Sequence, residues 1–368
     1  MEKMTSIKSE VLKYIRDYYQ VSLEEVCDRT KIKIESLQKF EAGKDFPSYP
    51  QLEKLADYYN KPVFFFFTNS MPNVDSIQVA FRSIEEHYKV GLTKPVKELI
   101  EKADMYRLSL EELFAEDSSV YFADIIKDCK SDADLTDTLR KTLKLDLTVQ
   151  RGFVRPENFL EFLRTNLFDN GIYVFKDSFK NDDISGLCVY DAKFPVILLN
   201  NKMSFKRQIF TLFHEIYHIY LKEADIDYTS GYEETKCNNF ASNFLIPPND
   251  LIEQIESIDV IQDIEVIDIL AKRYNVSRDA VMYRLLKMEL IDSDFYKENC
   301  VGSFRKADAL AGGNFYYTKM SYLGSSYLNK VFSSYYSGKI TKPQVGLYTG
   351  LKTMHVSKLA SKMMGGVF

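Results

Sequence analysis

Residues 210–218 place the strongest constraint on what this chain can fold into. They read Phe-Thr-Leu-Phe-His-Glu-Ile-Tyr-His, with apolar residues at helical spacing, so the pattern predicts a largely buried helix. On such a helix His214 and His218 lie one turn apart and project from the same face, where both imidazoles can reach one metal ion. Glu215 lies one residue further round the helix. Any fold of this chain must therefore bury a helix that carries polar groups on one face.

This arrangement is typical of a zinc site with hydrolytic chemistry. Zinc lowers the pKa of a bound water molecule towards about 7, and a neighbouring carboxylate, here Glu215, can then act as general base. The chain has only four histidines, and two of them belong to this motif, so a chance match is rare. The alternative interpretation is a core helix with two hydrogen-bonded histidines and no metal.

A catalytic zinc ion needs a third protein ligand, and the next predicted helix offers two adjacent acids. The apolar stripe of that helix places Glu234 on the buried side, whereas Glu233 points about 100° away. The stripe consists of Cys237, Phe240, Ala241 and Phe244. An acid on a buried face requires a cation. We therefore expect Glu234 to bind the metal, with Glu233, or a solvated acidic pair without metal, as the alternatives.

Hydrophobic patterning predicts an α+β protein that is mostly α-helical. Residues 171–175, 187–190 and 195–199 are β-rich runs and predict strands just before a helix over 206–221. The first 68 residues read as short helices, and a second helix-turn-helix-like stretch covers 266–288.

These changes in pattern along the sequence predict that the chain has four parts. Residues 1–68 form an all-α domain, and residues 69–165 form an acidic helical region that packs on the metal-binding core. Residues 166–299 contain that core, with its small sheet and histidine helix. Residues 300–368 form a basic, aromatic-rich helical domain.

The stretch from 171 to 248 resembles the ImmA/IrrE family of metallopeptidases. That family has a strand ending in Asn, then F-T-x-x-H-E-x-x-H, then E-x-x-A-N-x-F-A-x-x-x-L-M-P. The matching residues are Asn200 at the end of a strand, Phe210 and Thr211 before His214, Glu215 and His218, and Glu234 followed by Cys237, Asn238, Phe240, Ala241, Leu245, Ile246 and Pro247. Cys237 for Ala and Ile246 for Met are small apolar exchanges.

The resemblance implies a zincin-like fold in which His214, His218 and Glu234 bind Zn²⁺ and Glu215 is the catalytic base. It also implies that the strand at 195–200 lies beside the cleft. We expect an extended peptide to pair with the edge of that strand, along Val196, Leu198 and Asn200.

Residues 6–60 resemble the helix-turn-helix of the Xre/Cro type. Leu12, Arg16, Ser22, Val26, Phe40, Glu41 and Gly43 match its framework, whereas Lys31 replaces the usual turn Gly and Lys33 the usual cap. Ser36, Gln38 and Lys39 would then face DNA, with Gln38 able to read adenine. Residues 1–70 contain eleven basic and eleven acidic residues, so they lack the positive charge that dominates DNA affinity. A domain for protein docking or dimerisation is the alternative.

The C-terminal part has the opposite charge balance to the rest. Residues 300–368 carry nine Lys or Arg and one acid, a net charge of +8, which leaves −13 for the first 299 residues. Basic and aromatic residues together suit single-stranded nucleic acid. The interpretation we favour is a small helical domain with an aromatic core and a solvated lysine surface.

The cysteines and the apolar runs indicate a cytoplasmic protein. Five cysteines are scattered without a C-x-x-C pair, which fits a reducing compartment. No run approaches the roughly 20 apolar residues of a membrane span, and the first residues lack a basic-then-apolar signal pattern.

We expect a cytoplasmic zinc endopeptidase that cleaves a protein. The family resemblance points to a DNA-binding repressor or related regulator as its substrate. The alternative is a helix-turn-helix transcription regulator of mobile-element or toxin–antitoxin type, whose zinc domain senses or scaffolds without cleaving. DNA or single-stranded nucleic acid remains a possible partner through 1–68 or 300–368, no membrane partner is expected, and the oligomeric state, including a dimer, is left open.

Overall fold

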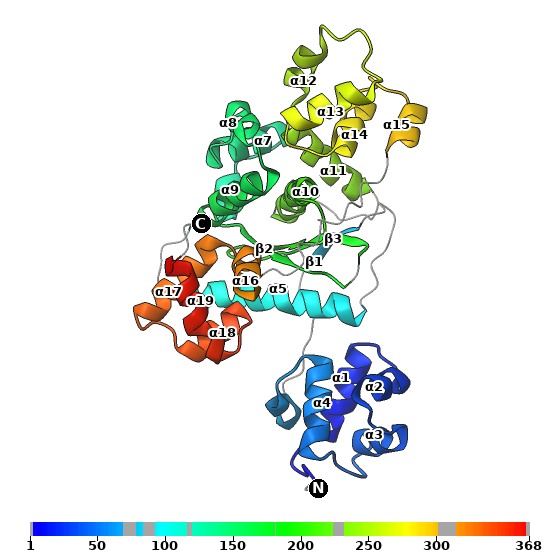
Figure 1. Cartoon of the computed structure of the whole chain (residues 1–368), viewed down its shortest axis with the longest axis vertical. Helices are drawn as coiled ribbons and strands as arrows, with labels where there is room; N and C mark the ends of the chain where they lie inside the picture. The colour runs from blue at the N-terminus through cyan, green and yellow to red at the C-terminus, as the bar shows by residue number, and fades with distance from the viewer. Residues whose placement is uncertain are drawn as a thin grey trace. The chain divides into compact units, whose positions relative to one another are not determined.

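The computed structural model describes residues 3–68, 79–83, 93–115, 120–180, 182–223, 232–300 and 314–365 (Figure 1). These residues divide into two compact units. The first holds the described residues before position 77 and the start of helix α5 (Lys94–Leu113), as far as Glu101. The second holds strand β1 (Val79–Ser83) and everything from Lys102 on. Helices dominate and strands form one small sheet, which confirms the predicted α+β class.

The first unit is built from short helices around one apolar core. They are α1 (Ser9–Tyr18), α2 (Leu23–Thr30), α3 (Ile34–Glu41), α4 (Tyr49–Tyr59) and the 3-10 helix η1 (Val63–Phe67). The Oγ of Ser22 accepts the backbone N–H of Glu25 at 3.1 Å and so caps α2. Lys31 ends α2 in the left-handed conformation, at φ 60°. Arg16 of α1 donates to Glu41 of α3 at 2.8 and 3.1 Å and ties the two helices together.

In the second unit the described strands form one four-stranded sheet in the order β1-β3-β4-β2. The strands after β1 are β2 (Tyr173–Asp177), β3 (Ile184–Val189) and β4 (Val196–Asn200). β3 is antiparallel to β1 and β4, whereas β2 and β4 are parallel. Figure 1 shows α10 (Phe205–Glu223) on one face and α5 on the other. The side chains of β2 to β4 are nearly all buried, because helices cover both faces of the sheet.

The predicted pairing of a peptide with Val196, Leu198 and Asn200 is wrong. These residues belong to β4, which is hydrogen-bonded to β3 on one side and to β2 on the other. A strand with two neighbours has no free backbone groups to offer a third.

The prediction that residues 69–165 are helical throughout is also wrong, because this range contains the strand β1. Its partner β3 lies about a hundred residues further along, so no local pattern could reveal the pairing.

Helices on the α10 side complete the main core of the second unit. They include α6 (Phe122–Ile126), α7 (Asp132–Thr142), α8 (Leu147–Gly152), α9 (Pro156–Asp169), α11 (Tyr232–Leu245) and α12 (Pro248–Ile255). The run continues with α13 (Ile264–Arg273), α14 (Arg278–Lys287) and α15 (Ser293–Asn299). One apolar cluster extends from α7 and α9 through α10 and α11 to α14. It holds α10 in place from every side except that of its polar residues.

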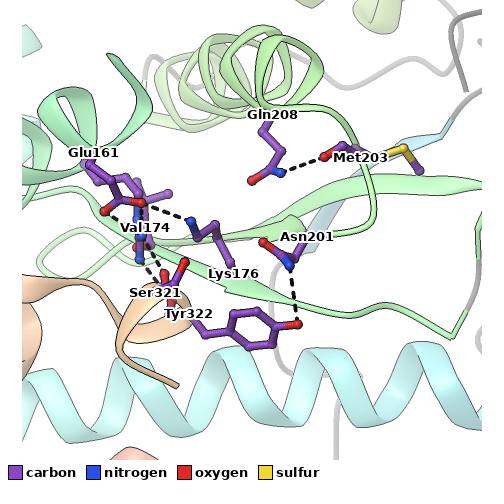
Figure 2. A network of polar contacts seen from close by, with 9 residues as sticks. Glu161, Val174, Lys176, Asn201, Met203, Gln208, Ser321 and Tyr322 are labelled. Atoms are coloured by element: carbon purple, nitrogen blue, oxygen red, sulfur yellow. Dashed lines mark hydrogen bonds and ion pairs between the residues drawn. The ribbon is translucent and has the colours of Figure 1, made fainter. Parts of the chain in front are cut away.

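The last helices pack beside β2 and α9. They are α16 (Phe315–Leu323), α17 (Ser325–Tyr336), α18 (Lys342–Thr349) and α19 (Thr353–Gly365). Arg164 of α9, 4% exposed, donates to the carbonyl oxygens of Ser321 and Tyr322 at 2.8 and 3.0 Å and to that of Val174. Figure 2 shows Ser321 and Tyr322 near Val174, and Glu161 accepting a hydrogen bond from Lys176. Arg164 therefore joins the C-terminal helices to the sheet.

The aromatic residues of these C-terminal helices are divided between core and surface. Tyr316, Tyr327, Phe332 and Tyr348 are buried, whereas Phe315, Tyr317 and Tyr336 are exposed. The helical character of this part agrees with the prediction, while its binding of nucleic acid stays a prediction. None of the described helices combines the length and the apolar character needed to cross a membrane.

Candidate metal centre

Two neighbouring helices supply the predicted site residues. α10 carries His214, Glu215 and His218, all of them buried, and α11 carries Glu234 with its side chain 21% exposed. α10 packs on β3 and β4 with one side and on α11 with another. The apolar residues of both helices fill the core, and His214, His218 and Glu234 are directed at one another between the helices.

Three metal-binding groups, two imidazoles and one carboxylate, converge between α10 and α11. The Nε2 atoms of His214 and His218 lie 3.1 Å apart. The Oε2 of Glu234 lies 3.2 Å from Nε2 of His214, and its Oε1 lies 3.2 Å from Nε2 of His218. Zinc in tetrahedral coordination, with bonds of about 2.0–2.1 Å, holds its ligand atoms about 3.3–3.4 Å apart. These three residues, hereafter the donor triangle, therefore have the chemistry and the spacing that zinc requires.

Electrostatics distinguishes Glu234 from its neighbour Glu233. Burial raises the pKa of Glu234, but hydrogen bonds from the two imidazoles outweigh it and hold that pKa below its usual range. Burial raises the pKa of Glu233, and the charge of His218 offsets this only in part. A metal ligand must be ionised. Of the two acids considered from the sequence, Glu234 is the one that the structure brings to both histidines.

Asn238 orients one of the imidazoles. Its Oδ1 lies 3.0 Å from Nδ1 of His214, and the residue is 7% exposed. Because a carbonyl oxygen only accepts, Nδ1 carries a proton, and Nε2 is the nitrogen that can give up its hydrogen bond to Glu234 and present a lone pair to a metal. The amide thus selects the tautomer that can bind a metal.

Glu215 lies outside the donor triangle, at the contact between α10 and β3. A Cβ atom added to Gly186 of β3 would lie 3.3 Å from Oε1 of Glu215 and only 2.6 Å from Cγ2 of Thr211. Real Cβ atoms do not approach other atoms so closely, so this contact requires glycine. Gly186 lets α10 lie against the sheet and places the carboxylate beside β3.

The proposed DNA-facing residues lie on α3. Gln38 and Lys39 are exposed and Ser36 is half-buried, while Leu37 and Phe40 point into the core of the first unit. Lys33 and Glu35 are exposed as well. The exposed side of α3 thus mixes both signs of charge, and contact with DNA remains a prediction.

Sequence reasoning missed three residues of the site. In the sequence, Asn238 stands out only as part of the family motif, and no pattern marks Gly186 as a residue of the site. Cys237 was read as an apolar exchange, although it follows Glu234 by three residues on the same helix face. The structure places its sulfur with nitrogen atoms of His214 and His218, all three within 4.8 Å of one another. The signal in the sequence was this i, i+3 spacing.

Comparison with protein families finds a match for part of the chain. A family model of the Peptidase M78 family, described as an IrrE N-terminal-like domain, matches residues 169–286. This range contains β2 to β4, α10, α11 and the whole donor triangle. No curated protein matches the chain. The family match supports a metallopeptidase-type enzyme for the matched range.

Proposed function

We propose that this protein is a zinc-dependent endopeptidase. The observation that carries the proposal is the donor triangle of His214, His218 and Glu234, inside a range that matches a metallopeptidase family. When bound, zinc would polarise the peptide carbonyl and lower the pKa of water. Glu215 would accept the proton of the attacking water and return it to the leaving amine nitrogen.

We place the substrate backbone at β1 instead of β4. Among the described residues, β1 has a partner strand on one side only, whereas β4 is enclosed and β2 is contacted by α16. In the register of the sheet, Arg82 of β1 lies opposite Gly186, the residue that contacts Glu215. A peptide paired with the free edge of β1 would therefore have only β1 between itself and β3, the strand beside the general base.

The substrate class rests on the resemblance of residues 171–248 to the ImmA/IrrE family. We propose a protein substrate, a DNA-binding repressor or related regulator, in the cytoplasm. Nucleic acid bound through 1–68 or 300–368 would be a partner that recruits or triggers the peptidase.

Metal content tests the donor triangle. Mass spectrometry of the purified chain should find about one zinc per chain, lost in His214→Ala and Glu234→Ala. Glu233→Ala is the matched control, because it removes the adjacent acid of the same helix, and it should keep the zinc. Loss of zinc in Glu233→Ala alone would instead make Glu233 the ligand. No zinc in the native chain, even after zinc is added, would reject the proposal.

Cleavage tests the role of Glu215. The zinc-loaded chain would be incubated with a peptide library made from a whole proteome, and new termini would be read by mass spectrometry. Glu215→Gln keeps the shape of the side chain but cannot accept a proton, so it should hold zinc and produce no termini. A Gln variant that cleaves as fast as the native chain would exclude Glu215 as the base.

The transcription-regulator function remains the second candidate. The exposure of Gln38 and Lys39 on α3 is the observation that favours it. A gel shift with DNA from upstream of the gene would test it. Salt-sensitive binding by the full chain, weakened by Gln38→Ala and Lys39→Ala together, would support this candidate. Equal binding by the native and double-variant chains would exclude these contacts.

A further inference from the structure

Cys237 lies close to the donor triangle, and the proposed reaction does not use it. It lies on α11, one turn after Glu234, and its side chain is fully buried as a free thiol. Its Sγ and one nitrogen each of His214 and His218 lie within 4.8 Å of one another. The thiol therefore lies close to a nitrogen of each imidazole.

The chemistry of these three groups is that of a metal site. Sulfur and imidazole nitrogen are the preferred ligands of zinc, with bonds of about 2.3 and 2.0–2.1 Å. Tetrahedral coordination would place Sγ about 3.5 Å from each nitrogen. Moving Cys237 between staggered χ1 rotamers shifts its sulfur by up to about 3 Å, so the side chain alone can close the remaining distance.

We propose that Cys237 is a fourth protein ligand of the metal, so that the resting site is closed by two histidines, one glutamate and one thiolate. The proposal rests on the metal site of the proposed function and goes beyond it. When the ion binds, the S–H proton leaves to solvent and a sulfur lone pair forms the new bond, with no change of oxidation state.

A closed site has a functional consequence. Structural zinc sites have four protein ligands, whereas catalytic sites keep one position open for water. With Cys237 bound, the open position is filled until a substrate peptide displaces the sulfur, so cleavage by the native chain is slow. Peptide cleavage then requires the sulfur to leave, and Cys237→Ala creates the open site permanently. The family pattern has Ala at this position, so slow cleavage by this route belongs to this chain and not to the pattern.

Cobalt spectroscopy tests the ligand directly. The full chain would be freed of metal, kept reduced and loaded with Co²⁺. Cobalt is used because a thiolate bound to Co²⁺ gives an intense near-ultraviolet charge-transfer band that His and Glu do not give. The band should appear in the native chain and vanish in Cys237→Ala, which should still bind cobalt. Cys188→Ala is the matched control, since it removes a buried thiol of the same unit from β3, and it should keep the band.

The outcomes separate this proposal from the proposed function. Cobalt bound without the band, or a band that survives in Cys237→Ala, overturns the fourth ligand and leaves the donor triangle standing. No cobalt bound by the native chain overturns both. Zinc affinity measured by competition with a chromophoric chelator gives a second readout. We expect Cys237→Ala to bind zinc about tenfold or more weakly, and an unchanged affinity contradicts the proposal.

Discussion

At the scale of single residues, two side-chain positions outside the donor triangle set its geometry. Gly186 lets α10 approach β3, and Asn238 fixes the tautomer of His214. Neither touches the metal position, yet each controls a group that does. Both can be tested with variants whose neighbours serve as controls.

Gly186→Ala should weaken the contact between α10 and β3. The added methyl would lie 2.6 Å from Cγ2 of Thr211, so the helix must shift. Overpacking of this kind costs about 1–3 kcal/mol of unfolding free energy, measurable by urea titration. Thr211→Ser removes the clashing methyl, so the double variant should recover most of the loss. A Gly186→Ala chain as stable as the native one would show that the close approach is unimportant.

Asn238→Ala should lower zinc affinity by about 10- to 100-fold, because His214 loses the acceptor that holds its Nδ1–H. Asn238→Asp keeps an acceptor and should lose little. The neighbouring Asn239 accepts from Tyr283 instead, at 2.8 Å, so Asn239→Ala controls for general damage to α11. Chelator competition measures all three. Equal losses from Asn238→Ala and Asn239→Ala would contradict a specific role for Asn238.

At the scale of elements, the second unit uses helices to protect its sheet. α16 contacts β2, the strand at the end of the sheet opposite β1. An uncovered edge strand is a template for unwanted pairing, so this contact removes one such edge. The contact depends on Arg164, whose guanidinium satisfies carbonyl oxygens at the C-terminal end of α16. Loss of this guanidinium should therefore destabilise the C-terminal helices as a group.

Arg164→Met should loosen the C-terminal helices. It leaves the carbonyls of Ser321 and Tyr322 without their donor and removes one cation beside Glu161. Glu161 is 43% exposed, so the main cost is that of buried carbonyl oxygens left without a donor, about 1–3 kcal/mol. Hydrogen exchange should accelerate in α16 and α17 before it does in α10. Arg155→Met is the control, since Arg155 lies just before the same helix but is mostly exposed, and unchanged exchange in Arg164→Met would refute the role.

At the scale of the whole molecule, a few buried charges make stability depend on pH. Lys176 of β2 is 2% exposed and donates to Glu161 at 3.0 Å. Burial, aided by the charge of Arg164, lowers the pKa of Lys176 to about 8, and Glu161 offsets this only in part. In the unfolded chain the pKa of lysine is about 10.4. Between these values the unfolded chain binds more protons, so this lysine makes stability rise with pH.

Comparing the native chain with Lys176→Met at each pH should isolate the contribution of Lys176 to stability. Below pH 8 the native chain carries the full cost of a buried ammonium group, and the cost disappears as the lysine loses its proton. The stability of the native chain relative to Lys176→Met should therefore rise by roughly 2 kcal/mol from pH 7.5 to 9.5, measured by urea titration. The exposed Lys127→Met should show a constant difference. A constant difference for Lys176→Met as well would contradict the shifted pKa.

The sequence by itself determined what depends on neighbours along the chain. Helical period places His214 and His218 on one face, and the apolar stripe of the next helix places Glu234 on its buried side. Three strands and the histidine helix were predicted to within a few residues, because β-rich runs and the helical spacing of apolar residues are local patterns. The α+β class follows from these elements. Where such local signals agree, they determine the secondary structure of the segment.

Only the tertiary structure decided which distant elements meet. Pairing with β3 and β2 places β4 inside the sheet, and no local pattern could exclude β4 as an edge. The closeness of Cys237 to both histidines, and of Gly186 to Glu215, depends on helix and sheet packing across many residues. The physical reason is that periodicity assigns a face to each residue, whereas the partner of that face is chosen by close packing of the whole core.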